Sequence, residues 1–355
     1  MKIAIIGFGG MGEWHSDRIR EFAIESKESK QEAFEISGIY DIDEQRNALA
    51  KQKGLNVFSS AQDIWNDEET EAVLIAVPND LHKDYVLAAA KAKKHIICEK
   101  PIALSSKQAT QMYEAAEREG VVFEVHQNRR WDDDYLTVKK IVDEKVVGDV
   151  YLIESRVMGA NGIPGDWRKI KAQGGGMMLD WGVHLIDQAL LAIHSKITSL
   201  YCEYSYIYGE EVDDGCSVTL NFENGIRYRI VIATDCFRNL PRWQVYGTEG
   251  TATVDDWQVN GGVTRCLVKK DEKLNGIKAG NGFTRTMAPR DGSSVEQYPL
   301  PRVRAERWAY YKKFIKTCRG LEEPAIKKSE VLRVFRVMEA CEKSANENIV
   351  IKENI

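Results

Sequence analysis

A glycine-rich turn near the start of the chain constrains the fold more than any other feature of the sequence. Apolar residues 3–6 precede the turn and an amphipathic segment follows it. The turn consists of Gly7, Phe8, Gly9, Gly10, Met11 and Gly12. Glycines at this spacing allow a tight bend, close approach of backbone N–H groups to a phosphate, and close helix–strand packing. The order strand, turn, helix predicts a dinucleotide bound at a helix N-terminus. A glycine-rich turn without a ligand is the alternative.

The first part of the chain alternates short apolar runs with longer amphipathic segments, as repeated βα units do. The runs are nearly continuous, which is typical of parallel strands buried on both faces. We expect strands at residues 2–6, 34–40, 72–76, 95–98 and 121–125. The sequence therefore predicts an α/β fold that begins with a Rossmann dinucleotide-binding domain over residues 1–127.

The remaining residues, 128–355, have a different pattern, which predicts a second α/β domain. We expect helices at residues 132–144 and 180–192 and strands at residues 150–157, 200–208, 216–222, 227–233, 243–246 and 251–254. Alternation of apolar and polar residues along most of these strands favours a mainly antiparallel sheet. Residues 269–301 lack a usable period and predict a long surface excursion. Two helices, at residues 302–318 and 328–347, are expected to close the chain.

Composition excludes several classes of protein. The net charge of −5 provides no basic stripe for nucleic acid. The seven cysteines are scattered without zinc-type spacing, so we expect reduced thiols in a cytoplasmic protein and no metal site. The N-terminal apolar run is too short for a signal peptide or a membrane span. We therefore expect a soluble protein with no nucleic-acid or membrane partner.

Residues at the ends of the second and third strands are candidates for contact with the dinucleotide. Asp41 is placed to accept hydrogen bonds from an adenosine ribose, which favours NAD over NADP. It could instead be a helix N-cap, because Glu44 follows three residues later. Ala76, Pro78 and Asn79 are expected to line the cofactor. His82 is either a further cofactor contact or a surface residue in the first turn of a helix.

Three further residues have the chemistry of a reaction centre. Lys100 follows the fourth strand and precedes a proline, so it is expected to point into the cofactor crevice, although a lysine is usually solvated. Asp180 and His184 are four residues apart and are expected to share one helix face. Asp180 would then orient His184 and stabilise its protonated form for proton exchange. A surface Asp–His pair is the alternative.

Together these features resemble the glucose–fructose oxidoreductase, inositol dehydrogenase and MocA-like (Gfo/Idh/MocA) family. The resemblance spans essentially the whole chain. Its marks are GFGGMG (7–12), AVPNDLH (76–82), EKP (99–101), HQNRRW (126–131), GGGMMLDWGVHLID (174–187) and TMAPR (286–290). It implies a second domain with an open sheet, used for substrate binding and oligomer contacts, and therefore a homo-oligomer, either a dimer or a tetramer.

The resemblance also implies roles for single residues. Lys100, Asp180 and His184 match the family's catalytic residues and also contact substrate. Glu99, Lys100 and Asn128 are implied to lie near the cofactor. Further substrate contacts are implied for Arg129, Trp131, Trp167 and Arg168, with structural packing as the alternative. Residues 157–167 depart from the family pattern, which leaves the substrate open.

These inferences predict an NAD-dependent oxidoreductase that transfers a hydride from a secondary ring hydroxyl of a sugar, a glycoside (at C3) or a cyclitol. Either His184 or Lys100 takes the hydroxyl proton. An NAD-dependent glycosidase that uses transient C3 oxidation and elimination is the alternative. A non-catalytic dinucleotide sensor is disfavoured, because it would be expected to lack Lys100 or His184.

Overall fold

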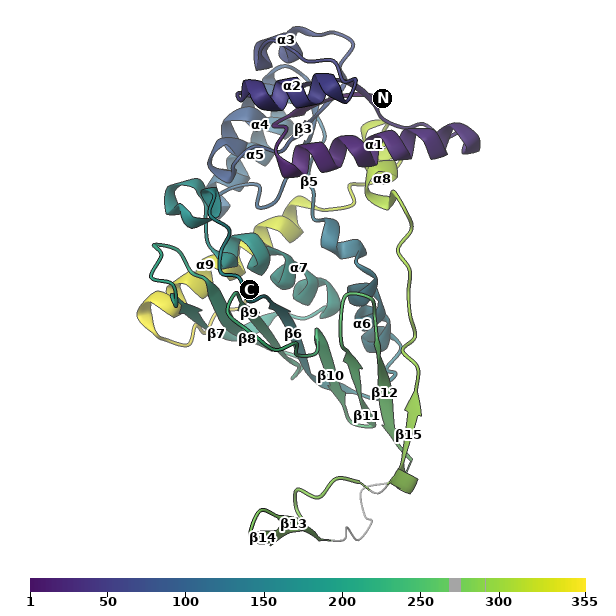
Figure 1. Cartoon of the computed structure of the whole chain (residues 1–355), viewed down its shortest axis with the longest axis vertical. Helices are drawn as coiled ribbons and strands as arrows, with labels where there is room; N and C mark the ends of the chain where they lie inside the picture. The colour runs from purple at the N-terminus through teal and green to yellow at the C-terminus, as the bar shows by residue number, and fades with distance from the viewer. Residues whose placement is uncertain (268–275, 291) are drawn as a thin grey trace.

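The computed structural model describes residues 1–267, 276–290 and 292–355 and begins with a parallel sheet (Figure 1). The strands of this sheet are β1 (Lys2–Ile6), β2 (Glu35–Tyr40), β3 (Ala72–Ile75), β4 (His95–Cys98) and β5 (Phe123–Val125). Their order is β2-β1-β3-β4-β5, and all four pairs are parallel. Most of their side chains are buried, as expected for a sheet covered on both faces. The predicted Rossmann-type sheet is confirmed.

Helices connect and cover these strands. They are α1 (Gly10–Ser29), α2 (Glu44–Gln52), α3 (Ala61–Asn66), η1 (Asn79–Leu81), α4 (His82–Lys91) and α5 (Ser106–Glu119). Local sequence explains where several of these helices begin. The side chains of Asp43, Ser60 and Ser105 each accept a hydrogen bond from a backbone N–H in the first turn of the helix that follows. A helix from the far end of the chain, α8 (Ala309–Cys318), returns to this core and packs Phe314 near Phe34.

The second sheet has eight strands in the order β15-β12-β11-β10-β6-β9-β8-β7. Their bounds are β6 (Val150–Met158), β7 (Ile197–Ser205), β8 (Gly215–Phe222), β9 (Arg227–Ala233), β10 (Trp243–Gly247), β11 (Gly250–Val254), β12 (Gly261–Cys266) and β15 (Val295–Tyr298). Among the described residues of this sheet, only β6 and β9 pair in parallel, so the predicted, mainly antiparallel sheet is confirmed.

Three helices pack against this sheet on the side of the parallel domain (Figure 1). They are α6 (Asp133–Asp143), α7 (Val183–Ala192) and α9 (Lys328–Glu347). The core between helices and sheet contains Trp243 and Tyr228, both fully buried. The predicted closing helix at residues 328–347 is confirmed, because its apolar stripe finds a face of the sheet to cover.

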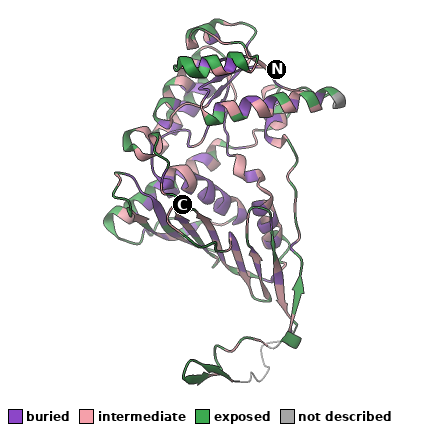
Figure 2. Cartoon of the chain, viewed as in Figure 1, coloured by how far each residue is buried: buried purple, intermediate pink, exposed green. Residues whose placement is uncertain are grey.

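The expected excursion at residues 269–301 contains strands that the sequence did not predict. Part of the expected excursion, β15, joins the edge of the large sheet, although its side chains are mostly exposed and carry no strand signal. The strands β13 (Ile277–Ala279) and β14 (Gly282–Thr284) form a hairpin that projects away from both sheets and is exposed (Figure 2). Residues 268–275 and 291 of the expected excursion lie outside the described residues.

The predicted helix at residues 302–318 starts later, at Ala309. The preceding segment runs along α6, where the Val303 N–H donates to Thr137 Oγ1 and the Ala305 N–H to Asp133 Oδ1. These long-range hydrogen bonds replace the first turns of the expected helix. Within the described part of the chain, no helix combines the length and apolarity needed to cross a membrane.

Candidate active site

The glycine turn joins β1 to α1 and has the conformation that the sequence requires. Gly7 has a φ of +89°, and a Cβ there would lie 2.5 Å from the Ala76 carbonyl oxygen. A Cβ on Gly12 would lie 1.9 Å from the Gly7 carbonyl oxygen. Gly9 and Gly10, in contrast, face open space at the start of α1. The first N–H groups of a helix have no partner within the helix, and the helix dipole adds positive charge at this end, so the turn fits the phosphates of a dinucleotide.

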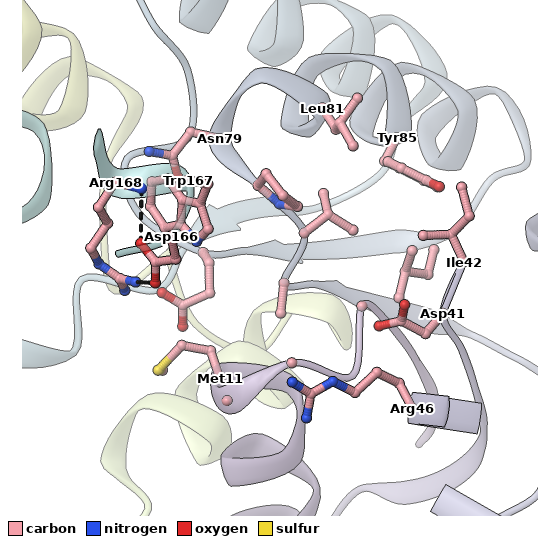
Figure 3. A pocket seen from close by; sticks show the side chains of 18 of the residues that line it. Met11, Asp41, Ile42, Arg46, Asn79, Leu81, Tyr85, Asp166, Trp167 and Arg168 are labelled. Atoms are coloured by element: carbon pink, nitrogen blue, oxygen red, sulfur yellow. Dashed lines mark hydrogen bonds and ion pairs between the residues drawn. The ribbon is translucent and has the colours of Figure 1, made fainter. Parts of the chain in front are cut away.

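A cavity of about 630 Å³ opens beside the turn, at the carboxyl ends of the parallel strands (Figure 3). This volume lies in the usual range for ligand pockets, about 300–1,000 Å³. The predicted site residues that line it are Gly7, Gly9, Gly10, Met11, Asp41, Ala76, Pro78, Asn79, Glu99, Lys100, Trp167, Arg168 and Asp180. Asp41 and Arg46 lie at one end and Trp167 and Arg168 at the other (Figure 3).

Asp41 directly follows β2, at the position predicted for a ribose contact. Its carboxylate accepts hydrogen bonds from the backbone N–H groups of Phe8 and Asp43. The N-cap of α2 is Asp43, whose side chain accepts from Gln45 N–H. The alternative interpretation of Asp41 as an N-cap is therefore wrong. Phe8 contributes its backbone to this contact, while its side chain is fully buried in the core.

The loop after β3 reaches both the cavity and the second domain. Asn79 Nδ2 donates to the Gly174 carbonyl oxygen at 3.0 Å, which ties this loop to the glycine run before Asp180. His82, in contrast, does not line the cavity. Its side chain is fully buried, with one ring nitrogen 2.9 Å from Pro101 O and the other 2.9 Å from Val77 O. The interpretation of His82 as a surface residue is therefore wrong, because the side chain forms a buried bridge between two loops. A cofactor contact of His82 stays a prediction.

Lys100 is held at the cavity wall by Asp180. Its Nζ lies 2.9 Å from both the carbonyl oxygen and Oδ1 of Asp180, and Arg168 Nε lies 3.3 Å from Oδ2. The Lys100 side chain is only 17% exposed, so it is not a solvated surface lysine. Burial favours the neutral form of Asp180, but the charges of Lys100 and Arg168 outweigh it and lower the pKa of this carboxyl. The centre is an ionised carboxylate between two cations.

The predicted interaction between Asp180 and His184 is replaced by these cation contacts. Asp180 lies in a short π-helix, η5 (Met178–Gly182), and His184 in the first turn of α7. Charged donors bind a carboxylate more strongly than an imidazole does. Among the described residues, His184 Nδ1 has no hydrogen-bond partner. Burial and the nearby charges of Lys100 and Arg129 hold the pKa of His184 well below its usual value, so the protonated form is not stabilised.

Three other predicted residues lie on the short helix η2 (Asn128–Trp131), outside the cavity lining. The Arg129 guanidinium lies 4.2 Å from the ring centroid of Trp181 and 2.8 Å from Asp132 Oδ2. Trp131 packs against the ring of Tyr310. The packing alternative therefore fits Trp131. The charge of Arg129 acts on His184 and lowers its pKa. The cofactor contact of Asn128 stays a prediction.

Several cavity residues were not predicted from the sequence. Arg46, Tyr85 and Asp166 line the wall together with Ile42 and Leu81 (Figure 3). Asp166 caps the short helix η3 (Trp167–Lys169) and pairs with Arg168 Nη1 at 2.8 Å. The sequence offered one signal for Asp166: it directly precedes Trp167 and Arg168, which were predicted to contact substrate. Arg46 lies on α2 among other charged residues and carried no distinguishing signal.

The cavity thus joins a glycine turn that fits a phosphate to a group of charged residues around Asp180. Residues 1–127 match the family model described as "Oxidoreductase family, NAD-binding Rossmann fold", and residues 135–253 match the Gfo/Idh/MocA C-terminal domain. The chain belongs to the Gfo/Idh/MocA family. It is an NAD(P)-dependent oxidoreductase acting on CH–OH groups, which confirms the predicted family and enzyme class.

Known proteins resemble the chain along most of its length. It is 26% identical over 298 residues to scyllo-inositol 2-dehydrogenase (NADP(+)) of Bacillus subtilis, covering 83% of this chain and 82% of that one. It is 24% identical over 367 residues to myo-inositol 2-dehydrogenase of Thermotoga maritima, covering 99% and 98%. The crystal structure of an NAD-binding protein from Listeria innocua is 39% identical, with a TM-score of 0.93 and 99% of both chains covered.

Proposed function

We propose that the chain is an NAD-dependent dehydrogenase that oxidises a secondary ring hydroxyl of a cyclitol or a sugar, including C3 of a glycoside. The observation that carries this proposal is the Lys100 ammonium held on Asp180 at the wall of the cofactor cavity. Two relatives named as inositol 2-dehydrogenases support a polyhydroxylated ring as substrate. When bound, the nicotinamide supplies the hydride acceptor, and the protein supplies orientation and charge.

Lys100 and His184 have different parts in this proposal. An ammonium group has three donors and no acceptor. Two Lys100 contacts go to Asp180, which leaves a donor to stabilise the oxygen of the reacting hydroxyl as it gains charge. His184 is neutral because its pKa is lowered, and among the described residues its Nδ1 has no hydrogen-bond partner. Although His184 is buried and is not part of the cavity lining, its imidazole therefore offers a lone pair for the hydroxyl proton. We therefore assign proton acceptance to His184 and charge stabilisation to Lys100.

We further propose NAD as the preferred cofactor. The Asp41 carboxylate is held at the cavity end by the backbone N–H groups of Phe8 and Asp43, where it favours ribose hydroxyls and repels a 2′-phosphate. Arg46 lines the same end with the opposite charge, and one relative is named as NADP(+)-dependent. The position of Asp41 at the strand end supports NAD over NADP.

The test is a screen of inositols, sugars and glycosides with NAD and NADP, in which the absorbance of the reduced cofactor reports the reaction. We expect NADH formation with one group of these compounds. Lys100→Met and His184→Gln should each lower kcat by about 10²- to 10⁴-fold, as loss of acid–base or electrostatic catalysis does. As the folding control, fluorescence measures whether the His184→Gln variant still binds NADH. Full turnover by both variants would show that this centre is not catalytic.

A second candidate is an NAD-dependent glycosidase in which ring oxidation is transient. A relative named 2,7-anhydro-N-acetylneuraminate hydratase, from Escherichia coli, is 28% identical over 236 residues, and its name describes addition of water rather than net oxidation. In this candidate, Lys100 and His184 would have the same parts in the oxidation step as in the dehydrogenase. Cleavage of a glycoside without accumulation of NADH would favour this candidate, and net NADH formation would favour the dehydrogenase.

A further inference from the structure

A buried polar cluster lies behind the catalytic lysine, and the proposed mechanism does not use it. Its members are His15 on α1, Glu99 after β4, His126 after β5 and Tyr311 on α8. All four are buried, with exposed fractions between 0% and 6%. Glu99 also forms part of the cavity wall. The cluster therefore connects α8 with the cofactor cavity.

The distances define a chain of hydrogen bonds that ends on Glu99. Its Oε1 lies 2.8 Å from His15 Nε2 and 2.8 Å from His126 Nδ1, and its Oε2 accepts the Lys100 backbone N–H at 3.2 Å. The other ring nitrogen of His15, Nδ1, lies 2.6 Å from the Tyr311 hydroxyl.

These contacts also determine where the protons are. An ionised carboxylate only accepts hydrogen bonds, so both imidazoles must present an N–H to Glu99. A neutral His15 then has a lone pair on Nδ1, which only a donor can satisfy. Tyr311 O–H is that donor. Tyr311 therefore selects the tautomer of His15 that binds Glu99.

The charge of the cluster follows from its burial. Burial, together with the neighbouring His126, lowers the pKa of His15 to about 4, so His15 is neutral at pH 7. Burial alone would raise the pKa of Glu99, but contacts with His126 and His15 hold it well below its usual range. The cluster therefore keeps a carboxylate ionised at the cavity wall, next to Lys100.

A metal ion is the other occupant that these side chains could accept. The ligand atoms of His15, Glu99 and His126 lie within 4.8 Å of one another. The same atoms already form hydrogen bonds with each other, and the other nitrogen of His15 is taken by Tyr311. The geometry favours a proton-sharing network, and a bound metal becomes an outcome of the test.

We propose that Tyr311 is a positioning residue that, through His15, holds the Glu99 carboxylate at the cavity wall, where its charge favours the oxidised cofactor over the reduced one. The oxidised nicotinamide ring is positively charged and the reduced ring is neutral, so a nearby fixed carboxylate binds the two differently. The inference rests on the proposed function, because it places the nicotinamide at the Lys100 end of the cavity.

The experiment measures the dissociation constants of NAD⁺ and NADH by fluorescence for the wild-type chain, Tyr311→Phe and Tyr310→Phe. Tyr310 is the matched control: it neighbours Tyr311 on α8, is similarly buried, and its hydroxyl has no hydrogen-bond partner among the described residues. In Tyr311→Phe the ratio Kd(NAD⁺)/Kd(NADH) should rise about tenfold, the effect of weakening one hydrogen bond to a charged group. In Tyr310→Phe the ratio should stay at the wild-type value.

The outcomes separate this inference from the proposed function. A wild-type chain that binds neither NAD⁺ nor NADH would contradict the proposed cofactor site itself. A wild-type chain that binds both, with equal ratios in the two variants, would overturn only the role of Tyr311. A change in thermal stability without a change in the ratio would have the same meaning. One equivalent of metal in the purified protein would also overturn it, because a metal would replace the shared protons.

Discussion

Lys100 shows how the surroundings of a single residue decide its chemistry. In the sequence it is a lysine before a proline, and most lysines are solvated. In the structure two contacts from Asp180 and the nearby charge of Arg168 place it in a mostly buried group of charges. The strength of such charge pairs increases as water is removed, so the site can stabilise an oxygen that gains negative charge.

At the same scale, Asp41 should determine the choice of cofactor. Replacing it with Asn removes the charge that repels a 2′-phosphate and keeps the side-chain shape. We expect Asp41→Asn to lower the ratio of kcat/KM for NAD to that for NADP by about tenfold, the size of one charge-assisted interaction. Steady-state kinetics with both cofactors measure this ratio. An unchanged ratio would argue against Asp41 as the determinant, and Arg46→Ala should shift the ratio in the opposite direction.

At the scale of elements, the π-helix η5 brings Asp180 to Lys100. Its start is held by Asp213, whose backbone oxygen accepts Met177 N–H at 3.0 Å and whose Oδ2 accepts Met178 N–H at 2.8 Å. Gly176 comes directly before this segment with a φ of +103°. Insertions of this kind into helices are frequent at functional sites. The position of Asp180 therefore depends on how closely Gly176 approaches Asp213.

Gly176→Ala should disturb the site without touching a reacting group. The new Cβ would lie 2.2 Å from Asp213 Oδ1, and the positive φ is strained for alanine. We expect a loss of about 1–3 kcal/mol in the free energy of unfolding and a lower kcat. Gly165→Ala is the control, because its Cβ meets open space. Urea unfolding and kinetics of the two variants test this, and equal behaviour would show that η5 tolerates the change.

At the scale of the whole molecule, buried charges join segments that are far apart in the chain. Arg130 on η2 binds both carboxylate oxygens of Asp187 on α7, at 2.7 and 2.6 Å, and Glu330 on α9 at 2.7 Å. Glu124 on β5 is fully buried near α8. These groups lie between the parallel sheet and the C-terminal helices, so the stability of the molecule depends on their protonation.

Glu124 should make the folded state less stable at high pH. Burial raises its pKa from the ordinary 4.5 to about 7. Below pH 4.5 this carboxyl is protonated in both the folded and the unfolded states. As the pH rises from 4.5 through 7, the unfolded state loses the proton more readily than the folded state, so the free energy of unfolding falls. Glu124→Gln should therefore raise the free energy of unfolding by up to ~3 kcal/mol at pH 8 and have little effect at pH 4.5. Unfolding at both pH values, with exposed Glu114→Gln as control, checks this. A pH-independent difference would contradict it.

The sequence by itself determined the features that arise from neighbouring residues. The glycine turn, the apolar strand runs and the apolar stripe of α9 predicted the parallel sheet, the mainly antiparallel sheet and the closing helix. Such patterns reflect backbone geometry and burial, which act over a few residues. The same locality explains why Gly7, Asp41 and Lys100 were placed at the cavity from the ends of their strands.

Only the tertiary structure decided which side chains became partners. Asp180 binds Lys100 rather than His184 because folding brings a cation 80 positions away in the sequence into contact. His82 became buried between two loops, β15 joined a sheet edge, and Tyr311 reached His15 from 296 positions away. Electrostatic and hydrogen-bond choices depend on every group within a few ångströms, and sequence spacing does not record distances between segments that meet only in the folded chain.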